Sequence, residues 1–169
     1  KIILLYNRFR RMINLDIHFK EGEYTFNFRV AALIRNGNKI LVEQNKQVDY
    51  YGLPGGRCKL GEDSITAIKR EIREETGRYV EYLRSVGIIE NFFTSRYTNS
   101  PYHEILIIHE LKFKNPEVYK EDKIINLEEK KDAKFYWKEI HELKKCKPEI
   151  AFKHLLDSNF FHFINRDSI

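Results

Sequence analysis

One short stretch constrains this chain more than any other part of it. Residues 56–77 read GRCKLGEDSITAIKREIREETG, with a glycine at each end and the glutamates Glu71, Glu74 and Glu75 close to the second glycine. Residues three and four apart share a helix face, so Glu71 would lie beside both other glutamates. Like charges this close destabilise a helix unless a cation neutralises them. The pattern therefore indicates a site for a hard divalent cation such as Mg²⁺ or Mn²⁺, which prefers oxygen ligands.

Local signals predict that this stretch is helical from about residue 64. Asp63 is a good N-cap, and its carboxylate suits the positive end of the helix dipole. Ile65, Ile68 and Ile72 recur at spacings of three and four, which gives one apolar stripe that must pack on a core. Gly77 supplies the left-handed residue that ends a helix. The stretch thus has a defined start, a buried face and a defined end.

The charges of this helix have a simpler alternative explanation. Arg70 and Glu74 stand four apart and can pair, so periodicity alone is also compatible with a solvated surface helix laced with salt bridges. The helix is preceded by the loop Leu53-Pro54-Gly55-Gly56. The loop is rigid at the proline and permissive at the glycines, which lets backbone carbonyls approach a ligand closely.

The spacing of the charged residues and glycines resembles that of a known family. It is similar to the Nudix box, G-x5-E-x7-R-E-U-x-E-E-x-G-U, in which U is an aliphatic residue. Arg78 departs from the pattern, because an aliphatic residue is expected there, and this change bears on the packing of the helix more than on chemistry. The positions that match are Gly56, Glu62, Arg70, Glu71, Ile72, Glu74, Glu75 and Gly77.

The resemblance implies a fold and an activity. The fold would be α/β, a Nudix α/β/α sandwich with a mixed β-sheet and the box helix, formed by residues 1–169 as a single domain. The activity would be a pyrophosphohydrolase that depends on Mg²⁺ or Mn²⁺. Its substrate would be a nucleoside di- or triphosphate, or another nucleoside diphosphate linked to a further moiety. A catalytically silent module that binds a nucleotide as a sensor is the alternative, although sensors commonly lose box carboxylates and this chain keeps all of them.

The resemblance also implies roles for the matched residues. Glu74 and Glu75 would ligate the metal, with the carbonyl of Gly56 as a further ligand. Glu71 would be a ligand or would position the network that activates water. Arg70 would orient the glutamates by pairing with Glu74 or with Glu62. Glu71, Glu74 and Arg70 are therefore the expected catalytic residues.

Outside the box, two residues are secondary candidates. Many family members recruit a further glutamate from a later loop or strand, and Glu104 is the candidate here; otherwise it is a solvent-facing strand residue. Arg29 lies on an upstream strand and could reach a phosphate; otherwise it pairs with an acidic neighbour. His103 is expected to be a surface histidine and not a base. A set of aromatic residues could stack on a nucleobase or belong to the core or its rim: Tyr50, Tyr51, Phe92, Phe93 and Tyr97.

Hydrophobic patterning predicts the remaining elements. Two runs rich in β-branched residues flank Asn36-Gly37-Asn38, a strong hairpin signal. The expected strands are 28–34, 39–44, 86–93, 102–113 and 134–137, with extended chain over 15–28 broken at 21–23, and a helix over 149–156. No role follows from the aromatic segment 158–169.

Length, charge and cysteines narrow the class of protein. The chain has 169 residues and a net charge of +5. Lysines over 112–147 alternate with acidic residues, which predicts a solvated face and disfavours nucleic acid as a partner. The weak positive field favours small anionic substrates such as nucleotides.

Cys58 and Cys146 make no disulfide framework, and Cys58 is expected to be an incidental small residue. Ile2–Leu5 is too short for a membrane span, so no membrane and a cytoplasmic location are expected; a homodimer is left open.

The flanks of the box do not identify the leaving group. Members that act on ADP-ribose usually carry a proline about sixteen residues past the box, and here that window holds Phe93 and Thr94, with Pro101 as the first proline. The tyrosine expected for diadenosine polyphosphate hydrolases would fall near residue 95, and Tyr97 is only close to it. The substrate therefore stays at the level of a nucleoside diphosphate compound.

Overall fold

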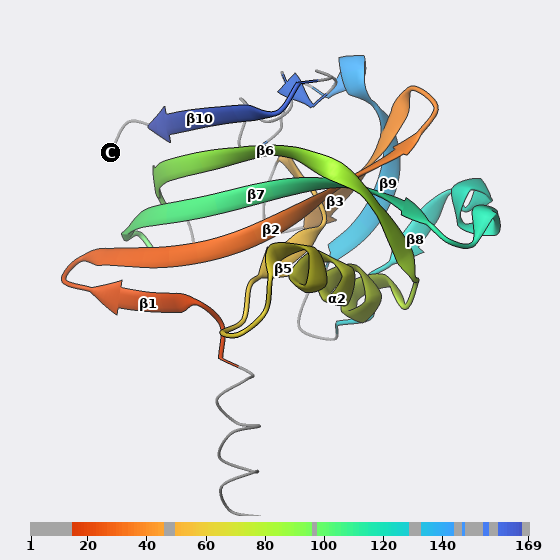
Figure 1. The fold of residues 1–169 in the computed structure, drawn as a ribbon. Helices are drawn as coiled ribbons and strands as arrows, with labels where there is room; N and C mark the ends of the chain where they lie inside the picture. Colours follow the sequence, from red (N-terminus) through yellow and green to blue (C-terminus); the bar gives the residue numbers. More distant parts are fainter. Residues whose placement is uncertain are drawn as a thin grey trace, which may run out of the picture.

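A mixed β-sheet organises the part of the chain that the computed structural model describes, which comprises residues 15–45, 50–95, 98–128, 133–143, 147, 154–155 and 159–166 (Figure 1). Its 10 strands follow the order β10-β6-β7-β2-β3-β9-β8, with β1 and β5 beside β2 and β4 beside β3. The strands are β1 (His18–Glu21), β2 (Tyr24–Asn36), β3 (Lys39–Asn45), β4 (Tyr51–Gly52), β5 (Gly55–Arg57), β6 (Val80–Thr94), β7 (Pro101–Phe113), β8 (Lys123–Ile125), β9 (Ala133–Glu139) and β10 (Phe161–Arg166).

Strand β2 is the centre of this arrangement. It pairs in parallel with β7 from Thr25 opposite Tyr102 to Ile34 opposite Leu111. Its end turns through Gly37, whose φ of 60° suits glycine, into the antiparallel strand β3. The predicted hairpin is therefore confirmed, and β2 is longer than predicted because its first half also pairs with β1.

The two faces of β2 belong to two different cores. Even-numbered residues such as Val30 and Ala32 face helix α2 (Ser64–Thr76), which buries Ile68 and Ile72 against them. Odd-numbered residues such as Leu33 lie in a second cluster on the opposite face. Figure 1 shows α2 lying across one face of the sheet. The even-numbered side chains of β2 from Val30 to Ile34 thus pack beneath the box helix, and the odd-numbered ones pack in the second core.

Helix α2 begins and ends as its sequence predicts. The Asp63 carboxylate accepts hydrogen bonds from the backbone N–H groups of Ile65 and Thr66, each at 2.9 Å. Gly77 caps the other end in the left-handed conformation, with φ of 69°. The residue after it, Arg78, points away from the core and pairs with Glu121 at 3.0 Å between Nη2 and Oε1. An ion pair thus stands where the family pattern has an aliphatic contact.

Several elements differ from the expectation. The segment 158–169, which had no predicted role, contains β10, and this strand pairs in parallel with β6. The ring of Phe161 on β10 packs where a Cβ would stand at Gly87, so glycine is required for the approach. The chain between β7 and β9 also forms a 3-10 helix, Pro116–Lys120, and β8. The helix predicted over 149–156 lies outside the described residues except for His154 and Leu155.

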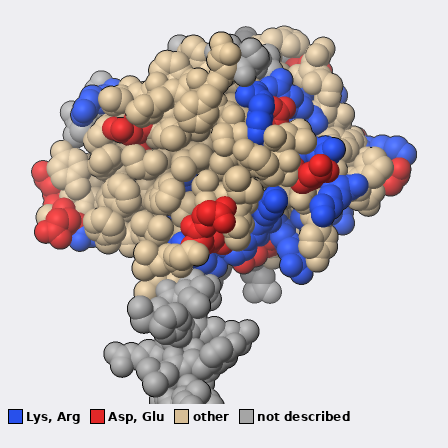
Figure 2. All heavy atoms as spheres, in the orientation of Figure 1, with Lys and Arg blue, Asp and Glu red and all other residues tan. Residues whose placement is uncertain are grey.

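The predicted α/β class with a mixed sheet is confirmed by this topology. Among the helices of the described residues, none is both long enough and apolar enough to span a membrane. Figure 2 shows acidic groups interspersed among the basic groups around α2 and β8, while the face over β1, β2 and β7 carries few charges. A stripe of a single sign, as nucleic-acid binding would require, is not seen on this face.

Candidate active site

The loop before α2 brings its backbone close to both the sheet and the helix. Gly55 has φ of 149°, and a Cβ there would overlap the Val30 carbonyl oxygen of β2. At Gly56 a Cβ would overlap the carboxylate of Glu71. Gly55 therefore requires glycine for steric reasons, whereas a Cβ at Gly56 would have to displace the Glu71 side chain. The backbone of Gly56 lies directly against this helix carboxylate.

Arg70 is the hub of the acidic residues of the box. Its Nε donates to Glu62 Oε1 at 2.7 Å, and its Nη1 donates to Glu71 Oε1 at 2.6 Å and to Glu74 Oε2 at 2.9 Å. Its Nη2 donates to Glu62 Oε2 at 2.8 Å and to the carbonyl of Arg57 at 2.9 Å. The sequence predicted a pairing with Glu74 or with Glu62, and the structure has both.

This pairing sets the charge state of the hub. Partial burial works against the charge of Arg70, but its hydrogen bonds to Glu62 and Glu71 outweigh burial and raise its pKa. Burial likewise works to raise the pKa of Glu62, yet the hydrogen bonds from Arg70 and from the Lys59 backbone lower it. The guanidinium is therefore a permanent cation that helps to hold Glu62 as a carboxylate.

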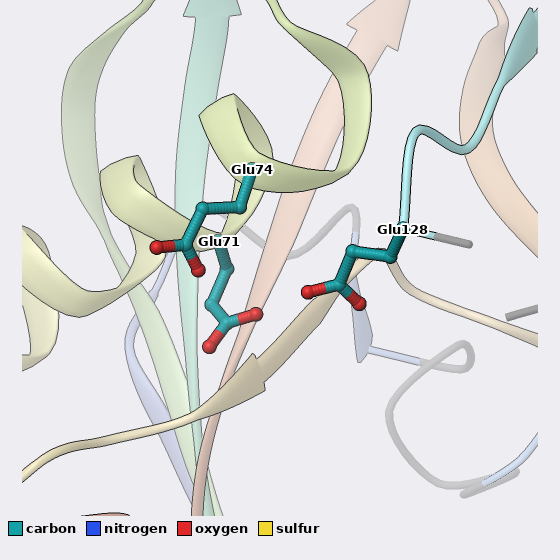
Figure 3. A group of neighbouring side chains, drawn as sticks. All are labelled: Glu71, Glu74 and Glu128. Atoms are coloured by element: carbon teal, nitrogen blue, oxygen red, sulfur yellow. The ribbon is translucent and has the colours of Figure 1, made fainter. Parts of the chain in front are cut away.

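Three carboxylates converge on one point beside this hub. Ligand oxygens of Glu71, Glu74 and Glu128 all lie within 4.8 Å of one another. Figure 3 shows the first two projecting from α2 and Glu128 facing them from the loop that follows β8. Oxygen ligands at this separation suit a hard cation such as Mg²⁺, Mn²⁺ or Ca²⁺. Arg70 pairs with two of the three, Glu71 and Glu74, as well as with Glu62. The donor set thus fits the divalent metal that the sequence predicts.

Glu128 was missed by the sequence analysis. The backbone N–H of Leu127 donates to the carbonyl of Glu75 at 2.7 Å, which fastens the loop to the last turn of α2. The side chain of Asn126 then accepts from the Glu128 N–H at 2.9 Å. In the sequence Glu128 belongs to a run of alternating acidic and basic residues that looks like a solvated linker. The signal for it is tertiary, and no local pattern carries it.

Glu75, the other predicted ligand, takes a different place. Its side chain is fully buried, at 0% exposed, and it does not belong to the group of three within the described residues. Its charge acts on Arg29 of β2, where carboxylates including Glu104, Glu43 and Glu75 outweigh the effect of burial and raise the pKa. Glu75 is therefore a buried carboxylate of α2 whose charge acts on Arg29.

Arg29 is placed as an anion ligand would be. Its closest ion pair, from Nη1 to Glu104 Oε2, is 3.9 Å long, and its side chain is 35% exposed. It makes no hydrogen bond within the described part of the chain, so the donors of its guanidinium are not used up there. Its neighbour on β2, Val30, pairs with Gly56 of β5. The backbone of β2 at Arg29 is thereby joined to the box loop, and the charges of Glu75 and Glu71 act on its guanidinium.

Glu104 is not the solvent-facing strand residue that was its alternative. It is 4% exposed, and its carboxylate accepts hydrogen bonds from Asn27 at 2.9 Å and from Asn91 at 3.5 Å. It also lies outside the group of three carboxylates. The glutamate that faces Glu71 and Glu74 from outside the helix is Glu128, and Glu104 has another environment.

The remaining candidates separate onto the two faces of the sheet. His103 stacks on Phe92 with ring centroids 4.4 Å apart, whereas Phe93 stacks on Tyr102 at 5.3 Å. Neighbouring strand residues alternate between faces, so Phe92 and Phe93 cannot line one site together. Tyr97 lies outside the described residues.

Cys58 is inert in this environment. Burial raises the pKa of its thiol to about 12, so the nucleophilic thiolate does not form near neutral pH. This agrees with its interpretation as a small residue that fills the core.

The sequence is similar to a known protein family and to a curated protein. The NUDIX domain model matches residues 25–157, which is most of the chain. The Bacillus subtilis (strain 168) protein "Putative ADP-ribose pyrophosphatase YjhB" is 30% identical over 74 residues, which are 44% of this chain and 35% of that protein. The match thus spans about a third of the length of this curated relative.

Solved structures share the fold. The mutator MutT protein from Bacillus halodurans has a TM-score of 0.58 at 22% identity, covering 82% of this chain and 90% of that chain. A UDP-X diphosphatase has a TM-score of 0.55 at 17% identity, covering 94% of this chain and 74% of the other. The MutT NUDIX hydrolase from Burkholderia pseudomallei has 0.56 at 19%, covering 77% and 98%. These similarities confirm the predicted α/β/α sandwich.

Proposed function

The chain belongs to the NUDIX domain family, and from that premise we propose that it is a pyrophosphohydrolase dependent on a divalent cation. The observation that carries the proposal is the convergence of ligand oxygens of Glu71, Glu74 and Glu128 within 4.8 Å of one another. Carboxylates this close repel one another unless a cation lies between them. A cation bound to substrate phosphates is the ligand that this chemistry favours.

The residues that would hold Mg²⁺ or Mn²⁺ come from two sources. Glu71, Glu74 and Glu128 are proposed from their mutual distances, while Glu75 and the carbonyl of Gly56 are proposed from the box pattern. A bound ion of this kind neutralises phosphate oxygens and lowers the pKa of a coordinated water. Glu128, coming from a separate loop, closes the group on the side that α2 leaves open (Figure 3).

The other residues of the site bind and orient. Arg70 fixes the rotamers of Glu71 and Glu74, so that the ligands are preorganised before substrate arrives. Arg29 offers unused donors to a phosphate oxygen. A nucleoside di- or triphosphate, or a nucleoside diphosphate linked to another group, is the proposed substrate class. The curated relative bears the name of an ADP-ribose pyrophosphatase, so ADP-ribose belongs in any screen even though the expected proline is absent.

The test is a hydrolysis screen with matched variants. Nucleoside di- and triphosphates, dinucleotides, nucleotide sugars and ADP-ribose are incubated with Mg²⁺ or Mn²⁺, and phosphate or pyrophosphate release is measured. Glu74→Gln and Glu128→Gln each keep size and polarity but remove a ligand charge, and kcat/KM is expected to fall about 100-fold or more. Glu117→Gln, an exposed carboxylate paired with Lys120 on the 3-10 helix, is the control and should retain activity.

The outcomes separate two functions. Full activity in Glu74→Gln would contradict the metal site. No turnover of any compound, with nucleotide binding retained by the wild type, would favour the sensor module instead. A homodimer and a cytoplasmic location are further predictions that this screen leaves untouched.

A further inference from the structure

A row of buried polar side chains crosses the sheet on the face opposite α2. Asn27 of β2 stands opposite Glu104 of β7, Glu104 stands opposite Asn91 of β6, and Asn91 stands opposite Asn165 of β10. Asn27, Glu104 and Asn91 are 4%, 4% and 7% exposed. Pairs directly opposite share a face, so these side chains form one continuous line across four strands.

The hydrogen bonds of this row all lead to Glu104. On one side Arg57 Nε donates to Asn27 Oδ1 at 3.0 Å, and Asn27 Nδ2 donates to Glu104 Oε2 at 2.9 Å. On the other side Asn165 Nδ2 donates to Asn91 Oδ1 at 2.7 Å, and Asn91 Nδ2 donates to Glu104 Oε1 at 3.5 Å. A carboxylate only accepts, which fixes the amide orientations. Each oxygen of Glu104 is thereby held from its own side.

Packing alone does not explain this row. The neighbouring row on the same face is largely apolar, with Leu106 opposite Ile89, and apolar side chains at the polar positions would be at least as stable. A buried carboxylate is costly unless it is paired. The charge that pairs with Glu104 is Arg29, two residues along β2 from Asn27. The polar row therefore serves to hold the counter-ion of Arg29.

The distance between these two charges is the informative quantity. At 3.9 Å, Glu104 neutralises Arg29 by Coulomb attraction but is too far to accept a hydrogen bond from it. The charges of Glu43, Glu75 and Glu71 also act on Arg29. Glu71 and Glu75, as proposed ligands, would be neutralised once a divalent cation is bound. Glu104 is the carboxylate with the largest effect on Arg29, and it then remains as the fixed counter-ion of a guanidinium whose donors are free for another anion.

We propose that Asn27 and Asn91 are positioning residues that hold Glu104 away from Arg29, so that the Arg29 guanidinium stays available to bind a phosphate of the substrate. The proposal rests on the pyrophosphohydrolase function and deepens it. Without its asparagine donors, Glu104 would satisfy its oxygens by closing on Arg29 in a two-pronged pair. The donors would then be consumed within the protein. Glu104 is accordingly a structural counter-ion in the reaction and not its base.

The test is a double-mutant cycle read by anion affinity. Inorganic pyrophosphate is titrated calorimetrically into the full chain with Mg²⁺ present, which needs no turnover. Arg29→Ala is expected to weaken binding about tenfold, the loss of a charge-assisted hydrogen bond. Asn27→Leu, which keeps volume and net charge, is expected to weaken it about threefold to tenfold in the wild-type background and not at all in the Arg29→Ala background.

A matched control separates positioning from general damage. Asn36→Leu removes a hydrogen bond of the same kind from the same strand, donated to the Tyr119 carbonyl at 2.8 Å, far from Arg29. It should leave pyrophosphate affinity unchanged. If Asn27→Leu does not fold, Asn91→Leu replaces it, because it frees the other oxygen of Glu104. Chain integrity is checked by thermal melting.

Three results would overturn the inference: unchanged affinity in Arg29→Ala, an undiminished effect of Asn27→Leu when Arg29 is absent, or an equal loss in Asn36→Leu. A failed hydrolysis screen is a different result. If the affinity losses of the Arg29 and Asn27 variants are not additive and no compound is hydrolysed, the anion site is upheld and the enzyme function is rejected. If compounds are hydrolysed and the two affinity losses are additive, the enzyme function is upheld and the role of the asparagines is rejected.

Discussion

Two neighbouring regions of this molecule combine arginine and carboxylates in opposite proportions. In the box, one arginine, Arg70, serves the carboxylates of Glu62, Glu71 and Glu74. In the polar row of β2, β7 and β6, one carboxylate, Glu104, is surrounded by donors and stands 3.9 Å from Arg29. An excess of acceptors attracts a cation, and an excess of donors attracts an anion. Together the two regions carry the charges that the proposed metal-bound phosphate would require.

The regions also differ in how they are assembled. The box is one contiguous stretch whose capped helix places its carboxylates by local geometry. The row joins residues as far apart as Asn27 and Glu104, 77 positions from each other along the chain. A substitution in the box loop should therefore act mainly on activity. A substitution where β10 packs on β6 should act first on stability.

The largest effect is expected from Gly56→Ala. The added Cβ would overlap the Glu71 carboxylate, a side-chain end that can move, so the fold should persist while the ligand is displaced. A displacement of about 1 Å at a catalytic group costs on the order of 100-fold in kcat/KM. Steady-state kinetics would measure the fall in kcat/KM, and a melting curve would show whether the fold persists.

Gly52→Ala is the control for that substitution. It adds the same methyl group on β4, where no atom lies within 4 Å of the new Cβ. Equal losses of activity in the two variants, or unfolding of Gly56→Ala, would remove the steric argument for the box loop.

A smaller effect is expected on stability from Arg70→Met. The substitution leaves Glu62, Glu71 and Glu74 without their common cation, and the side chain of Arg70 is 19% exposed. A loss of about 2 kcal/mol in the free energy of unfolding is expected, less than for a fully buried pair. Urea unfolding with and without Mg²⁺ measures it, and Mg²⁺ should stabilise the variant more than the wild type because the ion replaces the missing charge.

Arg78→Met supplies the comparison for this result. Arg78 has a single exposed ion pair with Glu121, so its loss should change stability by less than about 1 kcal/mol and independently of Mg²⁺. A Mg²⁺ effect of equal size in both variants would mean that the ion does not bind at the box.

The contrast between the regions also explains what the sequence could predict. The caps at Asp63 and Gly77 and the pairing of Arg70 follow from spacing within one helix, and all are confirmed. Glu128 could not be found in this way, because only the contact between Leu127 and the end of α2 brings it to the site. The burial of Glu104 depends on three strands meeting in register, which alternation within one strand cannot reveal.

Strand β10 was missed for a related reason. Its segment pairs in parallel with β6, a strand about 70 residues earlier in the chain, and has no hairpin partner whose turn would announce it. A glycine in the middle of β6, at Gly87, was a signal of close approach, but the sequence does not name what approaches.

Gly87→Ala tests whether the row depends on that strand. A Cβ at Gly87 would overlap the ring of Phe161, so β10, which also carries Asn165, must shift. Overpacking of this kind costs about 1–3 kcal/mol in the free energy of unfolding. Chemical denaturation measures the loss. Activity per folded molecule should fall far less than in Gly56→Ala, and the reverse order would mean that β10 contributes directly to the site.

The smallest effect concerns His109 of β7, which links the start of α2 to β6. Its Nε2 lies 3.0 Å from Ser64 Oγ at the start of the helix, and its Nδ1 lies 3.3 Å from Ser85 Oγ on β6. Burial lowers its pKa below the ordinary value of 6.5, and the charge of Asp63 offsets this only in part.

The unfolded chain therefore binds a proton at His109 before the folded chain does as pH falls. The contribution to stability is complete above about pH 6.5 and is lost as pH drops through the depressed folded pKa. Melting temperatures between about pH 7.5 and 5.5 should fall for the wild type and fall less for His109→Gln, which keeps a hydrogen bond without titrating. An equal fall of melting temperature with pH in both proteins would mean that His109 is not the source of the acid sensitivity.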